Sequence, residues 1–218
     1  LPWYIIIGPP GAGKTTALRY SGIQFPGQDQ MDEGAQGFGG TRNCDWWFAE
    51  DAVLIDTAGR YTTQDSDAEA DRNSWTAFLD LLKRGRPDQP INGVILAFSV
   101  EDLMTGTPES LAQHAATVRE RLAEIHETLR VDFPVYVLFT KADLIAGFRE
   151  YFATFSRVRR NGVWGVTFQT RDRKAETHKS VGDEFDALVS RLSDEVVDRM
   201  SEEQDGVNRI AIFGLPGQ

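Results

Sequence analysis

Apolar and polar residues alternate along this chain in blocks typical of strands that are followed by helices. Short apolar runs with the length of strands lie at 3–7, 45–49, 52–56, 93–99, 134–139, 163–168 and 209–213. Longer stretches with apolar residues at helical spacing lie at 16–20, 73–85, 108–130, 145–155 and 183–200. The run at 93–99 is apolar on both faces, which favours a central parallel strand. The short turn at Glu50 and Asp51 predicts an antiparallel hairpin at an edge of the sheet.

A glycine-rich loop separates the first strand from the first helix. Glycines let the backbone approach a phosphate closely, and the start of a helix adds its positive end. In such a loop a lysine reaches the β- and γ-phosphates, and a threonine hydroxyl ligates Mg²⁺. The predicted nucleotide-binding residues here are Gly8, Pro9, Pro10, Gly11, Ala12, Gly13, Lys14, Thr15 and Thr16. The alternative is an ordinary glycine turn.

With this loop, the order of elements predicts an α/β fold of the three-layer P-loop NTPase kind, similar to small GTPases. We expect a mostly parallel sheet with one antiparallel edge hairpin, in a single domain over 1–218.

Two further segments fit the metal and γ-phosphate side of such a site. Asp56 ends an apolar strand and opens the sequence Asp56-Thr57-Ala58-Gly59, so its carboxylate is placed to hold Mg²⁺. The polar segment 34–42 is where nucleotide switches place a residue that orders on the γ-phosphate, and Thr41 is the candidate. A flexible linker is the alternative for this segment. The predicted metal ligands are Thr15, Thr41 and Asp56.

The residues around Asp56 bear on catalysis. Thr57 stands where ATPases with a carboxylate base carry glutamate, which favours the GTPase branch. Arg60 stands where Ras-like GTPases orient the attacking water, and arginine accepts no hydrogen bond. We therefore expect slow hydrolysis, and a second switch over 60–72. The candidate catalytic residues are Lys14, Thr41, Gly59 and Arg60.

Thr140, Lys141 and Asp143 form a base-reading motif at the end of the strand 134–139. The Asp143 carboxylate can accept both guanine N1–H and N2–H₂, which adenine cannot offer. The stem of Lys141 can lie over the purine face. Because Thr140 replaces the usual asparagine, ATP stays possible beside GTP. The loop that completes the guanine pocket in small GTPases is not found, and 169–171 are only positional candidates.

The composition of the chain restricts the classes of binding partner and the cellular setting that we expect. The 218 residues carry a formal net charge of −10, which argues against a nucleic-acid partner. The single cysteine, Cys44, excludes an internal disulfide. No apolar run is long enough for a transmembrane helix, and no signal peptide is evident. The chain begins almost inside a strand, so we expect a domain taken from a longer protein.

Several stretches together resemble the cytoplasmic nucleotide-binding domain of the IcmF/TssM family of type VI secretion systems. The likeness lies in LPWY at 1–4 with the loop, GGTRNCDWWF at 39–48, AVLIDTAGRYTTQ at 52–64, PING at 90–93, FPVYVLFTKADLIAGF at 133–148 and VWGVTF at 163–168. The resemblance implies a cytoplasmic domain of a bacterial inner-membrane protein whose membrane segments lie outside this chain. It also implies partner subunits of the TssL and TssJ type and a baseplate.

Three other interpretations stay open. DTAGR with TKxD also resembles the signal-recognition-particle GTPases, in which a paired domain completes the site, although no helical N-domain matches here. The chain could instead bind nucleotide as a scaffold with negligible hydrolysis, as Arg60 suggests. A P-loop kinase would need a lid with clustered arginines, and Arg157, Arg159 and Arg160 come late for that role.

Overall fold

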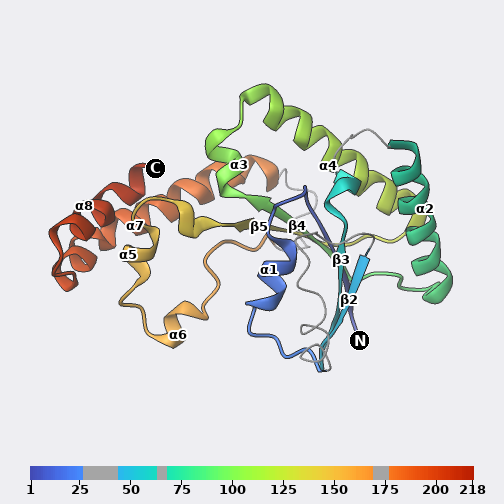
Figure 1. The fold of residues 1–218 in the computed structure, drawn as a ribbon, viewed down its shortest axis with the longest axis horizontal. Helices are drawn as coiled ribbons and strands as arrows, with labels where there is room; N and C mark the ends of the chain where they lie inside the picture. The colour runs from blue at the N-terminus through green and yellow to red at the C-terminus, as the bar shows by residue number, and fades with distance from the viewer. Residues whose placement is uncertain (27–43, 63–67, 169–176) are drawn as a thin grey trace. The chain divides into compact units, whose positions relative to one another are not determined.

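The computed structural model describes residues 1–26, 44–62, 68–168 and 177–218 (Figure 1). The chain divides into two compact units, Leu1–Lys141 and Ala142–Gln218, and each is described by itself. The expectation of a single domain over 1–218 stays a prediction.

A mixed five-stranded sheet forms the centre of the first unit. Its strands lie in the order β2-β3-β1-β4-β5, and β2 alone is antiparallel to its neighbour. The predicted mostly parallel sheet with one antiparallel edge hairpin is therefore confirmed. The strands are β1 (Trp3–Ile7), β2 (Cys44–Phe48), β3 (Val53–Thr57), β4 (Gly93–Ser99) and β5 (Val135–Thr140).

Helices cover both faces of this sheet. α2 and α4 pack against each other on one face, and α1 packs on the other (Figure 1). The Thr107 hydroxyl caps α4 by accepting from the Ser110 amide, and Pro108 occupies the first helical turn. The helical elements of this unit are α1 (Lys14–Arg19), the 3₁₀ turn η2 (Gly59–Thr62), α2 (Ala68–Gly85), α3 (Val100–Thr105) and α4 (Pro108–Leu129).

Successive residues of the strands contribute alternately to two apolar clusters, one on each face of the sheet. Ile5 and Ile55 pack with Trp75 of α2 and Ile125 of α4 on one face. On the other face, Ile6 belongs to a smaller cluster, which also holds Leu18, Trp47 and Leu54. Because successive side chains of a strand point to opposite faces, a strand between two helical layers needs apolar residues throughout. This explains the continuous apolar runs of β1 and β3.

Among the residues that the structure describes, the second unit contains helices and no strand. Its core holds Tyr151, Leu192, Val196 and Ile212, and the Tyr151 hydroxyl donates to the Leu192 carbonyl at 2.9 Å. The elements are η3 (Ala142–Leu144), α5 (Phe148–Phe152), α6 (Arg157–Arg160), η5 (Thr177–Ser180), α7 (Val181–Glu202), α8 (Gly206–Gly214) and η6 (Leu215–Gly217).

Two strands predicted from the sequence are absent from this unit. Residues 163–168 lie in no helix or strand, and Trp164 packs edge-on against Phe148 and Phe152 of α5 instead of joining a ladder. Residues 209–213 lie inside α8, which Asp205 caps by accepting from the amides of Val207 and Asn208. Tertiary packing and a helix cap thus outweigh the strand propensity of these residues.

Candidate functional site

The glycine loop lies between the end of β1 and the start of α1. Gly11 and Gly13 have φ angles of 76° and 75°, in the left-handed region that favours glycine, and Gly13 is the N-cap of α1. A Cβ on Gly8 would lie 2.4 Å from the Ala97 carbonyl oxygen of β4, so only glycine fits there. The glycines thus permit a tight loop that is packed against the carboxyl end of the neighbouring strand.

Lys14 folds back across this loop. Its Nζ donates to the carbonyl oxygens of Gly8 at 2.9 Å and of Pro9 at 3.2 Å, and the residue is only 7% exposed. Burial lowers the pKa of Lys14, while the nearby charge of Asp56 acts in the opposite direction. The arrangement holds an ammonium group inside the loop, as recognition of a phosphate anion requires.

Thr15 and Asp56, two of the predicted metal ligands, lie in direct contact. The Thr15 hydroxyl donates to Oδ2 of Asp56 at 2.5 Å, and Asp56 is fully buried at the end of β3. The next residue, Thr57, donates its hydroxyl proton to the Ile6 carbonyl at 2.7 Å and ties β3 to β1. A hydroxyl and a carboxylate are hard oxygen ligands, so this pair fits Mg²⁺.

Gly59 brings the segment after β3 against the loop. A Cβ here would lie 2.4 Å from the Pro10 backbone nitrogen, so the two main chains approach too closely for any side chain. The next side chain, Arg60, forms an ion pair with Asp71 of α2, with Nε 2.6 Å from Oδ1. Arg60 is therefore held toward α2 by a carboxylate.

The end of β5 meets the loop from the other side. The Thr140 hydroxyl donates to the Ala12 carbonyl at 2.6 Å, which gives the threonine of the predicted base-reading motif a structural role. Lys141 has a φ of 58°, and its Nζ pairs with the Glu101 carboxylate of α3 at 2.8 Å. Within the second unit, Asp143 pairs with Arg149 at 2.6 Å, and this hydrogen bond lowers the pKa of the Asp143 carboxyl.

The first unit therefore brings together most of the residues predicted to contact phosphate and metal. These are Gly8, Pro9, Pro10, Gly11, Ala12, Gly13, Lys14, Thr15, Asp56 and Gly59, with Thr140 beside them. Thr16 lies within α1, where its carbonyl accepts from the Tyr20 amide. Thr41 and the predicted switch segment 34–42 lie outside the described residues, as do 63–67 of the predicted second switch. The guanine-pocket candidates 169–171 lie outside them as well.

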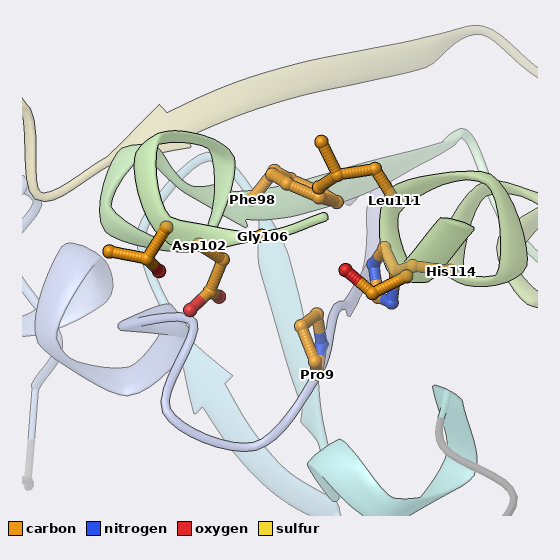
Figure 2. A pocket seen from close by; sticks show the side chains of 8 residues that line it. Pro9, Phe98, Asp102, Gly106, Leu111 and His114 are labelled. Carbon is orange, nitrogen blue, oxygen red and sulfur yellow. The ribbon is translucent and has the colours of Figure 1, made fainter. Parts of the chain in front are cut away.

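Sequence reasoning missed the helix α3 and the pocket beside it. This pocket of about 250 Å³ lies against Pro9 of the glycine loop (Figure 2). Its walls are formed by Pro9, Phe98, Asp102, Thr105, Gly106, Ser110, Leu111 and His114. The acidic pair Glu101 and Asp102, directly after an apolar strand, was the available signal, because the carboxyl ends of parallel strands form functional sites.

Two further kinds of feature are absent from the described residues. No group of three or more His, Cys, Asp or Glu side chains among them is placed to hold a metal ion. None of the helices in this part of the chain is both long and apolar enough to cross a membrane.

The fold and the loop define an α/β domain with a glycine-rich turn between its first strand and first helix. Residues 68–218 match the IcmF-related N-terminal domain, so the chain belongs to the IcmF/TssM family. Over 221 aligned residues it is 51% identical to the type VI secretion system component TssM1 of Pseudomonas aeruginosa. That alignment covers the whole chain but only 20% of TssM1, so the chain spans about a fifth of this relative's length.

Proposed function

We propose that this domain binds a nucleoside triphosphate, GTP in preference to ATP, together with Mg²⁺, and hydrolyses it slowly. The observation that carries this proposal is the contact of Thr15 with Asp56 beneath a glycine loop that already encloses the Lys14 ammonium. In this arrangement the amides of the loop and α1 would bind the β-phosphate, and Lys14 would exchange its carbonyl partners for phosphate oxygens.

Thr15 and Asp56 would hold the metal, one directly and the other directly or through water. Mg²⁺ would neutralise phosphate charge when bound. Thr41 would complete the metal and γ-phosphate contacts, and the amide of Gly59 would donate to the γ-phosphate. Lys141 and Asp143 would read the base, which requires each of them to leave its present ion pair.

Membership of the IcmF/TssM family supports a proposal about the complex in which the domain acts. We propose that the domain acts as a nucleotide-dependent conformational switch in the cytoplasmic part of a type VI secretion membrane complex. Its partners would be the TssL- and TssJ-type subunits and the baseplate, reached through the longer protein. The domain would then be attached to the bacterial inner membrane by segments outside this chain.

A titration with fluorescent GTP and ATP analogues in the presence of Mg²⁺ tests binding. We expect saturable binding that Lys14→Ala weakens about tenfold or more, because a buried ammonium–phosphate hydrogen bond is lost. Arg84→Ala, which removes an exposed positive charge from the last turn of α2, is the matched control and leaves binding unchanged. Equal binding by Lys14→Ala and the native chain would refute the site.

The second candidate function is nucleotide binding with negligible hydrolysis, which the Arg60–Asp71 ion pair favours. An arginine that is held toward α2 cannot accept a hydrogen bond from the attacking water. Single-turnover measurements with protein in excess separate the two functions. Decay of bound GTP to GDP, abolished in Lys14→Ala, supports the slow enzyme. Triphosphate that stays intact supports the scaffold.

A further inference from the structure

The pocket lined by Pro9, beside the glycine loop, carries polar side chains on two sides and apolar side chains on a third. Figure 2 shows Asp102 and His114 on opposite sides of it, with Pro9 on the loop side and Phe98 and Leu111 across from it. Asp102 comes from α3 and His114 from α4, so the turn at Gly106 holds the two side chains apart. The pocket therefore has polar ends and an apolar wall.

The hydroxyl donors of the pocket are already used. Thr105 donates to the Glu101 carbonyl at 2.8 Å, and Ser110 donates to the Thr107 carbonyl at 2.9 Å. The Asp102 carboxylate makes no hydrogen bond or ion pair with any described residue. His114 has a buried Nε2 that also lacks a partner among the described residues.

The unused groups can accept hydrogen bonds. Burial lowers the pKa of His114 despite the nearby Asp102 charge, which favours the neutral ring. A neutral imidazole protonated at Nδ1 has its acceptor at Nε2, and a carboxylate only accepts. Among the residues that the structure describes, no lysine or arginine lines the pocket. The complementary ligand is therefore a cation rich in donors, with an apolar stem that can lie on Phe98, Leu111 and Pro9.

We propose that this pocket receives an arginine side chain from a partner protein. A guanidinium has five N–H donors in a plane and an apolar stem, which matches a carboxylate at one end and an apolar wall beside it. The strongly acidic chain, with its net charge of −10, adds long-range attraction for a basic partner.

The surface next to the pocket indicates a protein segment and not a free cation. A second, apolar pocket of about 330 Å³ shares Phe98, Leu111 and His114 with the first. It extends to Val137 and Phe139 of β5, which are 54% and 57% exposed. A single guanidinium compound would leave this apolar surface in water, whereas apolar residues next to an arginine would cover it.

Occupation of this pocket would act on the glycine loop. Pro9 forms one wall, and its carbonyl oxygen accepts a hydrogen bond from Lys14 at 3.2 Å. A bound arginine would thus contact the residue that positions the ammonium group of the loop. Apart from Pro9, the residues of this pocket are not among those predicted to bind nucleotide, so the proposal does not depend on nucleotide binding.

Amide NMR titrations of the isotope-labelled chain without nucleotide test the proposal. The probe is acetyl-arginine methylamide, and its neutral control is the citrulline analogue, which has nearly the same shape. We expect saturable chemical-shift changes for the amides of the loop residues next to Pro9 and for the amides of α3 and α4. The citrulline analogue and Asp102→Asn should each weaken binding about fivefold or more, because the charge-assisted contact is lost.

The matched control is Glu109→Gln, which removes an exposed carboxylate from the first turn of α4 but does not line the pocket. It should leave arginine binding unchanged. Absence of shifts, equal binding of the citrulline analogue, or equal effects of the two substitutions would overturn the proposal.

A second arm separates a protein partner from a free cation. A blocked arginine–leucine dipeptide should bind about threefold or more tighter than the arginine probe, because the leucine buries apolar surface. Val137→Thr keeps the shape of the side chain but makes it more polar. It should therefore reduce the difference in affinity between the dipeptide and the arginine probe. Equal affinity of the two probes would contradict a protein segment. Self-association of the chain that Asp102→Asn abolishes would contradict it too, because the occupant would then be a second copy.

Discussion

The glycine loop and the base-reading motif differ in how their residues are held. Lys14 and Asp56 are buried, at 7% and 0% exposure, and they are fixed by main-chain carbonyls and by the Thr15 hydroxyl. Asp143 and Arg149 form an exposed ion pair, with side chains 47% and 69% exposed. The phosphate side of the proposed site is therefore preorganised by the fold, whereas the base side carries its carboxylate in a solvent-exposed ion pair.

This contrast separates the residues that should determine the stability of the fold from those that should determine nucleotide selectivity. Substitutions of Gly8 or Gly59 should disturb the folded backbone as well as the site, because β4 packs directly on the loop and the loop packs on the segment after β3. Changes at the exposed Asp143 of the predicted base-reading motif should alter selectivity with little effect on folding.

Gly8→Ala should lower the free energy of unfolding by about 2–3 kcal/mol, because the new Cβ would lie 2.4 Å from the Ala97 carbonyl oxygen. Urea denaturation monitored by tryptophan fluorescence measures the change. Gly85→Ala is the control, since a Cβ at the end of α2 meets nothing within 4 Å. Equal stabilities of the two variants would show that the loop is not packed as described.

Asp143→Ala should weaken GTP binding about tenfold and leave ATP binding nearly unchanged, because only guanine offers two donors to this carboxylate. Competition against a fluorescent analogue measures both affinities. Asp186→Ala removes an exposed carboxylate from α7 and should change neither. A parallel loss of GTP and ATP affinity would mean that Asp143 does not read guanine.

Arg149→Gln should have the smallest effect, about a twofold gain in GTP affinity at low salt, since it frees Asp143 from an exposed ion pair. The gain should fade as ionic strength rises, because salt screens this pair in the native chain. Arg157→Gln, with the same charge change on the exposed surface of α6, serves as the control. A gain that persists in high salt would point to a cause other than the ion pair.

The sequence predicted the loop and the sheet well because their signals are local. Glycine spacing, a lysine–threonine pair and apolar runs of strand length determine the course of Gly8 to Thr15 and the four parallel strands. The edge hairpin was predicted for the same reason. The contact between Thr15 and Asp56 was also foreseeable, since the carboxyl ends of adjacent parallel strands meet at one edge.

Non-local contacts account for what the sequence did not predict. The pairing of Lys141 with Glu101 depends on the short helix α3, which follows β4. The spacing of apolar residues in the sequence does not predict this helix. The structure places His114 half-buried beside Phe98, in the wall of a pocket, a position that depends on how α4 packs against β4. Trp164 and the residues of α8 follow tertiary packing instead of their strand propensity.

The central claim is that main-chain amides of the glycine loop enclose a β-phosphate. Amide NMR spectra of the labelled chain, recorded while GDP and Mg²⁺ are added, test it most directly. The account predicts saturable downfield shifts of the Gly11, Gly13 and Lys14 amides, lost in Lys14→Ala while the rest of the spectrum stays folded. Unchanged loop amides in a folded sample at millimolar GDP and Mg²⁺ would contradict it.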